Sequence, residues 1–285
     1  MKKIKILDVG ASDTIEKMPK ALFNISDLYL IEARDTQENQ DDFIKDKQFS
    51  NVKVFNYCIS DNNEKTNLYV TNVEEASSLY KPNDQTNKFW RKDNAIKLKE
   101  KIPINAITLE KFIIDNHINH IDLLNISAQA SELKILKGLQ DKIKNISIII
   151  CQTEFIEIYE NQPLFNDLMD FLNKNNFEFL GFKELLKFED KMINGTAIFI
   201  NKGNLDHEYK LQLVKILSYL NFNENAKWII HNSRFSIDEK KQILKTQLDQ
   251  LNVIQRFLFN IVNFTNKFLL NKFIFDKLKL YMVKI

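Results

Sequence analysis

Glycine, proline and cysteine are scarce in this sequence, with five, four and two among 285 residues. The cysteines, Cys58 and Cys151, are isolated and lack a CxxC spacing, which argues against a secreted disulfide framework or a cysteine-based metal site. We interpret both as buried free thiols. No apolar run approaches the ~20 residues of a membrane-spanning helix. The opening MKKIKIL is too short for the apolar region of a signal peptide. The sequence therefore predicts a soluble, cytoplasmic protein.

The chain also has no large excess of positive or negative charge, since its formal net charge is only +2. A nearly balanced chain gives no reason to expect nucleic acid as a partner. Apolar residues make up 44% of the chain, enough for a substantial core. The length suits one α/β domain with an appendage, or two small domains.

Short apolar runs alternate with helical patterns along the first two thirds of the chain. This alternation predicts an α/β fold with a doubly wound, mainly parallel, Rossmann-like sheet of seven strands. The predicted strands are 4–9, 28–33, 52–59, 121–127, 146–152, 177–182 and 196–201, with 66–71 as an edge hairpin. Helices are predicted at about 14–23, 36–47, 131–139 and 164–175.

The pattern changes near Gly203, the last glycine. Residues 205–285 are helical in pattern and carry 13 Lys/Arg against 7 Asp/Glu, whereas residues 1–204 carry 27 against 31. We therefore expect a domain at 1–203 and an all-helical extension at 204–285.

The first strand ends in DVGAS, a loop with a single glycine, Gly10. A dinucleotide site favours G-x-G-x-x-G, because the pyrophosphate needs close approach to the backbone. Here Ser12 and Asp13 occupy the loop, and Asp13 would repel a pyrophosphate. S-adenosylmethionine carries no phosphate and has a sulfonium cation, so it suits this loop better than a nicotinamide cofactor.

Polar residues end the next two strands. Glu32 lies about 20 residues after the loop, where a carboxylate can accept both ribose hydroxyls; its alternative role is an exposed charge at a strand end. Ser60 and Asp61 can hold the adenine edge, although Asp61 is equally suited to a turn. The predicted cofactor site comprises Asp8, Gly10, Ala11, Ser12, Glu32, Ala33, Ser60, Asp61 and Ser127.

Seven segments together resemble the FkbM-type S-adenosylmethionine-dependent methyltransferases. They are DVGAS, LIEA, NYCISDNNEKTNLYVT, SSLYKPN, IDLLNISAQASELKILKGL, EFIEIYENQPLF and FLNKNNFEFLGF, in family order, covering residues 4 to about 201. The resemblance implies the class I methyltransferase fold. It also implies methyl transfer mainly to hydroxyl oxygens of sugars, glycolipids or polyketide-type products, often in surface-polysaccharide pathways.

The chain departs from the family pattern at four positions. Thr14 stands in a loop that usually has a second glycine, and LNISAQASE replaces a sequence close to LKIDVQGAE. Asn125, Ser127 and Ala130 thus replace lysine, aspartate and glycine, while Gln129 and Glu132 are retained. Because of these changes, a second interpretation stays open. The chain can be a catalytically degenerate homologue that acts as a scaffold in a glycan-biosynthesis assembly.

Methyl transfer to a hydroxyl requires alignment and removal of a proton. Glu154 is our first candidate for the base, with Tyr159 beside it. The alternative role for Glu154 is structural, as a cap or in an ion pair. We assign Ser78, Tyr80, Gln129 and Glu132 to the acceptor side. The stretch KFWRKDNAIKLKEK is either a lid, with Trp90 and Arg91 on a sugar, or a solvated helical arm.

Two other features complete the sequence-based expectations. His117 and His120 lie at the amino end of a strand and lack a third ligand, so we expect no metal site. Segment 251–285 has six Lys/Arg, one acid and six phenylalanines. It can pack on its own domain or in a dimer, bind a partner enzyme, or lie on an anionic membrane at the inner face.

Taken together, the sequence predicts an S-adenosylmethionine-dependent O-methyltransferase acting on a sugar or glycan hydroxyl. A nicotinamide-dependent enzyme is disfavoured by the loop.

Overall fold

The computed structural model describes residues 3–11, 22, 25–33, 51–203, 205–240 and 242–243. The chain divides into two compact units, Met1–Leu213 and Val214–Ile285. The predicted helices at 14–23 (apart from Leu22) and 36–47, and the basic segment 251–285, lie outside the described residues.

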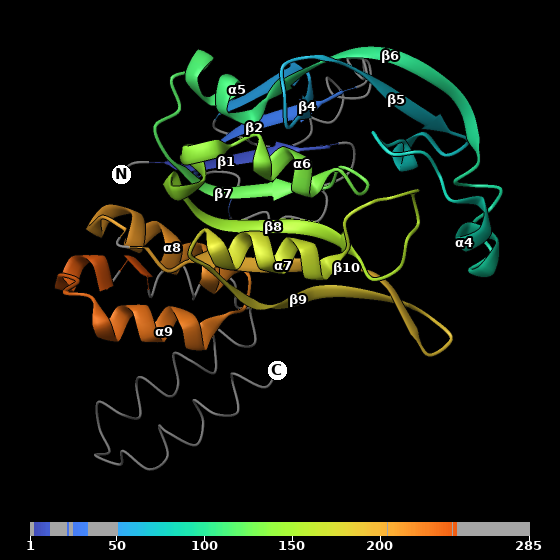
Figure 1. Ribbon diagram of the computed structural model, residues 1–285. Coiled ribbons are helices and arrows are strands. Elements are labelled where there is room, and N and C mark those ends of the chain that lie inside the picture. Colours follow the sequence, from blue (N-terminus) through green and yellow to red (C-terminus); the bar gives the residue numbers. More distant parts are fainter. Residues whose placement is uncertain are drawn as a thin grey trace. The chain divides into compact units, whose positions relative to one another are not determined.

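A seven-stranded sheet forms the centre of the first unit (Figure 1). Its order is β3-β2-β1-β7-β8-β10-β9, with the first five strands parallel and β10 antiparallel to both neighbours. The strands are β1 Ile4–Val9, β2 Ser26–Glu32, β3 Asn51–Asn56, β7 Ile121–Ile126, β8 Ile146–Glu154, β9 Phe177–Phe188 and β10 Lys191–Asn201. The predicted α/β, doubly wound, mainly parallel seven-stranded sheet is confirmed.

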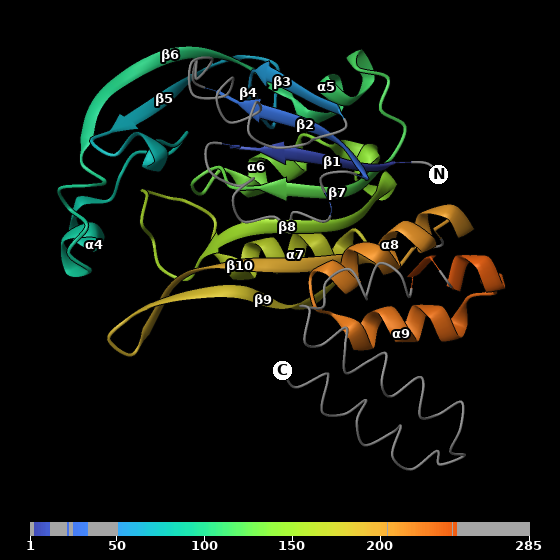
Figure 2. The ribbon, with the colours of Figure 1, turned by 180° about the vertical axis from the view of Figure 1, so that it is seen from behind.

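The central strands are buried over their whole length, as their continuous apolar runs predict. All six residues of β7 and all but one residue of β1 are buried. Helices α6 Glu132–Lys137 and α7 Phe165–Lys174 lie on the same face of the sheet, as the two opposite views show (Figures 1 and 2). Their apolar side chains, such as Ile135, Leu136 and Leu168, join the strands in one core cluster.

A second sheet, β4-β6-β5, was only partly predicted. Its strands are β4 Cys58–Ser60, β5 Lys65–Thr71 and β6 Leu98–Thr108, and β5 runs antiparallel to β6. The prediction of one strand over 52–59 is wrong, because the chain leaves the large sheet at Tyr57 and β4 pairs with β6 instead.

The charged stretch before β6 is not the predicted helical arm. Helix α4 Asp84–Phe89 ends there, and the chain then continues into β6. Trp90 is buried, and its ring nitrogen Nε1 donates to Oδ1 of Asn87 at 3.0 Å. The expectation that Trp90 stacks on a sugar is therefore wrong, because the ring packs in a small core with Ile96 and Tyr159.

The remaining described helices are α5 Leu109–Asp115, α8 His207–Tyr219 and α9 Asn223–Asn232, with 3-10 turns η1 Glu74–Ala76 and η2 Gln140–Asn145. The helical pattern predicted after residue 205 is confirmed in α8 and α9. The domain boundary at Gly203 stays a prediction. No helix among the described residues is long and apolar enough to cross a membrane.

Candidate cofactor and acceptor site

A cleft that is partly open to solvent lies at the carboxyl ends of β1, β2 and β7; its empty space is about 580 Å³ when the open part is counted. This is the edge at which parallel α/β sheets bind ligands. Residues of η1 and the segment that follows it, Glu74 to Leu79, also line the cleft. Its lining comprises Val9, Gly10, Ile31, Glu32, Ala33, Tyr57, Cys58, Ile59, Leu68, Glu74, Glu75, Ser77, Ser78, Leu79, Ser127, Ala128, Gln129, Ser131 and Ile135.

Gly10 lets the first loop pass directly beside the chain that follows β7. Its φ is +80°, and a Cβ built there would lie 2.1 Å from the carbonyl oxygen of Ser127. The Gly10 amide donates to the carbonyl of Ile31, and the Ser127 amide donates to the carbonyl of Val9, both at 2.9 Å. Only glycine fits this contact, which fixes the floor of the cleft.

Glu32 ends β2 and Ala33 follows it; both line the cleft, as the predicted ribose position requires. The Glu32 side chain is largely buried, with 7% of the residue exposed. The backbone carbonyl of Glu32 accepts from the amide of Tyr57 at 3.1 Å. This bond joins the end of β2 to the segment that begins at Tyr57, which also lines the cleft.

Next to the end of β2, the cleft is lined by Tyr57, Cys58 and Ile59. The residues predicted to hold adenine, Ser60 and Asp61, do not line it. Ser60 is buried and donates to Oδ1 of Asp61 at 3.1 Å; neither residue lines the cleft. Sequence reasoning missed this part of the lining because the turn at Tyr57 interrupts an apparently continuous strand.

Asp8 and Ala11 are buried beside the cleft but do not line it. Oδ1 of Asp8 accepts from the side-chain amide of Asn125 at 2.9 Å. Asn125 stands where the resembling family has lysine, so an amide-to-carboxyl hydrogen bond joins β1 to β7 here. The predicted cofactor residue Ser12 lies outside the described residues.

A chain of hydrogen bonds leads from the cleft to Glu154. The Ser127 hydroxyl donates to Oε1 of Gln152 at 3.0 Å, and the Gln152 amide donates to Oε1 of Glu154 at 3.1 Å. The Gln162 amide donates to the other oxygen of Glu154 at 3.3 Å. Glu154 is the last residue of β8 and does not itself line the cleft.

Burial raises the pKa of Glu154 to about 7. Burial, and after it the charge of Glu154, also raise the pKa of Glu132 well above its ordinary value. Glu132 accepts from the amide of Ala128 at 2.8 Å, which joins the first residue of α6 to the loop before it. The structure therefore brings two buried carboxyls together next to the cleft, and the charge of Glu154 favours the protonated form of Glu132.

The predicted acceptor residues divide into two groups. Ser78 and Gln129 line the cleft, whereas Tyr80 and Glu132 do not. Tyr80 is half-buried, and the ammonium of Lys134 lies 4.3 Å from its ring centroid. Tyr159, predicted beside the base, is buried outside the cleft.

The histidines are at the opposite edge of the sheet, as expected. His117 is exposed, whereas His120 is buried and its Nε2 lies 2.8 Å from Oγ of Ser147. Within the described part of the chain, no three His, Cys, Asp or Glu side chains are grouped to hold a metal ion.

The residues present fit S-adenosylmethionine better than a phosphorylated cofactor. Three lining residues, Glu32, Glu74 and Glu75, carry carboxylates, and the described lining contains no Lys, Arg or His. Such a lining repels a pyrophosphate and tolerates a sulfonium or an ammonium group.

Fold and cleft together have the features of an S-adenosylmethionine-dependent methyltransferase. Residues 8–179, more than half of the chain, match the family model of the methyltransferase FkbM domain. The chain therefore belongs to the FkbM methyltransferase family, and its methyl donor is S-adenosylmethionine.

One solved structure is reported for comparison. It is that of Streptococcus pneumoniae Sp1610, described as a candidate tRNA (m1A22) methyltransferase and crystallised with S-adenosyl-L-methionine. Its sequence is 10% identical to this chain. The match covers 87% of this chain and 94% of that one, with a TM-score of 0.34. At that score the likeness adds nothing to the assignment. No match was found among curated proteins.

Proposed function

We propose that this methyltransferase transfers a methyl group to a hydroxyl of a sugar or glycan, such as a surface-polysaccharide or glycolipid precursor. The observation that carries the proposal is the path Ser127–Gln152–Glu154, which connects the cleft to a buried carboxyl. Methylation of a hydroxyl releases a proton, and a carboxylate with an ordinary pKa of about 4 is a weak base toward it. A carboxyl with a pKa of about 7 is suited to accept that proton.

In this proposal, the bound cofactor supplies a methyl group activated by a positively charged sulfur. Glu32 holds the ribose hydroxyls, and the hydroxyls of Ser77 and Ser78 and the amide of Gln129 orient the acceptor. These are neutral hydrogen-bonding groups of the kind that match the hydroxyls of a sugar. Glu154 accepts the acceptor's proton through a bridging water, since it lies below the lining rather than in it.

The proposal is tested by incubating the purified protein with methyl-labelled S-adenosylmethionine and a panel of oligosaccharides and glycolipids. Products are located by mass spectrometry and by nuclear magnetic resonance of the methyl group. We expect an O-methyl sugar. Methyl transfer to nitrogen or carbon acceptors only would overturn the proposal.

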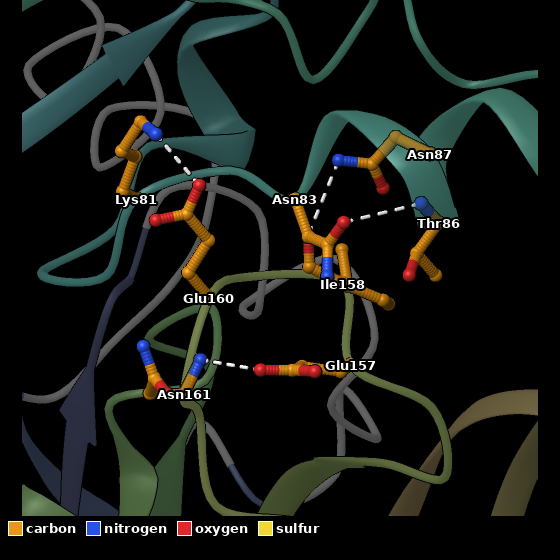
Figure 3. Close-up of polar contacts among 8 residues, drawn as sticks. All are labelled: Lys81, Asn83, Thr86, Asn87, Glu157, Ile158, Glu160 and Asn161. Atoms are coloured by element: carbon orange, nitrogen blue, oxygen red, sulfur yellow. Dashed lines mark hydrogen bonds and ion pairs between the residues drawn. The ribbon is translucent and has the colours of Figure 1, made fainter.

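Glu154→Gln then tests the role of the base. We expect a loss of turnover of roughly 10²-fold or more, the usual contribution of general base catalysis, with cofactor affinity unchanged. Glu157→Gln is the matched control, because Glu157 lies three residues away, is exposed, and accepts only from the amide of Asn161 among the described residues (Figure 3). Equal activity of the two variants would remove Glu154 from the mechanism.

A further inference from the structure

One wall of the cleft belongs to a segment that is fastened at both ends. We call this segment, residues 74–87, the strap. Its first part includes the lining residues Glu74, Glu75, Ser77, Ser78 and Leu79. Its second part runs along the loop 157–161 that follows β8 (Figure 3).

The second part of the strap is held mainly by backbone contacts. The Asn83 amide donates to the carbonyl of Ile158 at 2.9 Å, and the Glu160 amide donates to the carbonyl of Lys81 at 2.7 Å. The Asn87 side chain adds a bond to Ile158 at 3.2 Å (Figure 3). The Lys81–Glu160 ion pair, at 2.6 Å, is exposed and contributes little. This part of the strap is therefore a fixed anchor for the part that lines the cleft, rather than a freely opening lid.

The loop between β7 and α6, opposite the strap, has an unfavourable backbone. Gln129 and Ala130 are consecutive non-glycine residues in the left-handed region, with φ of 49° and 73°. Each such residue costs roughly 1 kcal/mol or more and persists only where its surroundings hold it. Ser78 supplies one restraint, because its hydroxyl donates to the carbonyl of Gln129 at 2.5 Å.

Tyr159 joins this loop to the strap. Its hydroxyl lies 2.8 Å from the carbonyl oxygen of Ala76 and 3.2 Å from Oε1 of Gln129. A phenol has one proton, and a carbonyl can only accept, so the hydroxyl donates to Ala76. The Gln129 amide, turned by a half rotation, then donates to the phenol oxygen. One hydroxyl thus bonds both walls of the cleft.

We propose that Tyr159 is a positioning residue that sets the shape of the cofactor cleft before the cofactor binds. It holds Gln129 and the strap at a fixed separation, although it does not line the cleft itself. A cleft formed in advance loses less conformational freedom on binding, which raises affinity. The inference goes beyond the proposed function, because it holds for any acceptor.

The environment of Tyr159 supports positioning rather than proton transfer. Only 1% of the residue is exposed, so an acceptor does not reach it. Burial, and then the charges of Glu154 and Glu132, raise the pKa of its phenol well above the ordinary value. The group therefore stays protonated at neutral pH and does not serve as a base.

The test is calorimetric titration of Tyr159→Phe with S-adenosylmethionine and with S-adenosylhomocysteine. We expect both to bind roughly fivefold to tenfold more weakly, the effect of losing a buried hydrogen bond. Tyr29→Phe is the matched control, since Tyr29 is a buried tyrosine of β2 that does not line the cleft. Its affinity should equal that of the wild-type protein. Unchanged affinity in Tyr159→Phe would overturn the proposal.

A second variant distinguishes positioning from general loss of stability. Ala130→Gly removes the left-handed penalty at its φ of 73°, so the loop needs less restraint. We expect Ala130→Gly to restore most of the affinity lost in Tyr159→Phe. In turnover, the KM for S-adenosylmethionine should rise while kcat and its pH profile stay nearly constant. A kcat that falls at unchanged KM, with an altered pH profile, would make Tyr159 catalytic and contradict the inference.

Discussion

Gly10→Ala tests the contact that forms the floor of the cleft. The substitution places a Cβ 2.1 Å from the backbone oxygen of Ser127 and 2.8 Å from its carbonyl carbon, at a φ of +80°. The left-handed backbone costs ~1–2 kcal/mol for alanine. Relief of the clash must move backbone, which breaks the bond from the Ser127 amide to Val9 and costs ~1 kcal/mol more. The total is roughly 2–3 kcal/mol.

Thermal unfolding and cofactor titration measure the two consequences. For a domain of this size, a loss of ~2–3 kcal/mol lowers the Tm by roughly 4–12 °C. We also expect S-adenosylmethionine binding to disappear, because the floor of the cleft moves. Gly203→Ala is the control, since its Cβ would meet only the side chain of Asn201 at 2.8 Å. If Gly10→Ala melts and binds like the wild-type protein, the close approach of the two loops is not as described.

The remaining predictions concern buried groups. Because the pKa of Glu154 rises from 4.5 to about 7 on folding, its contribution to stability is complete below pH ~4.5 and is lost as pH rises to 7, by roughly 3 kcal/mol. Glu154→Gln should flatten this decline in denaturant unfolding measured from pH 5 to 8, and an unchanged slope would contradict the assigned burial. Phe112→Ala should destabilise the protein by ~3–5 kcal/mol, since Phe112 is 1% exposed in the main core; a loss below ~1 kcal/mol in urea unfolding would refute that packing. Both thiols should react slowly with a maleimide at neutral pH, because burial raises the pKa of Cys58 to about 11 and that of Cys151 well above its ordinary value. Bound cofactor should protect only the cleft-lining Cys58, and equal protection of both would argue for a global effect.

The apolar runs predicted the central sheet because buried parallel strands carry their signal locally. IKILDV and IDLLNI form β1 and β7 within a residue of the predicted bounds. The strand LKEKIPINAIT was missed because six of its first eight residues are exposed and its partner, β5, lies about 30 residues away. Such a strand is defined by a distant pairing rather than by its own pattern.

The same distinction applies to the site. Gly10, Glu32 and Ala33 were predicted because a parallel sheet presents its strand ends at one edge, and these residues line the cleft. Asp8 was assigned to the same edge, but it lies one residue before the lining and bonds Asn125. The rim at Glu74 and Glu75 was not predicted, because a loop's path across the sheet depends on tertiary contacts.

The positioning role inferred for Tyr159 also could not be predicted from the sequence. IYENQPLF identified the segment through its resemblance, and proximity to Glu154 suggested chemistry. Whether a tyrosine points into a cleft or supports its wall depends on side-chain direction, which the sequence alone does not give. The bond to the carbonyl of Ala76, 83 positions earlier, decides between the two.

Titration of the wild-type protein, Glu32→Ala and the exposed control Glu178→Ala with S-adenosylmethionine shows whether the cleft binds the methyl donor through Glu32. We expect binding in the micromolar range for the wild-type and control proteins. Affinity should be at least ~10-fold lower for Glu32→Ala, because two charge-assisted bonds to the ribose are lost. Absence of heat at millimolar cofactor, or full affinity in Glu32→Ala, would contradict binding of the methyl donor through Glu32.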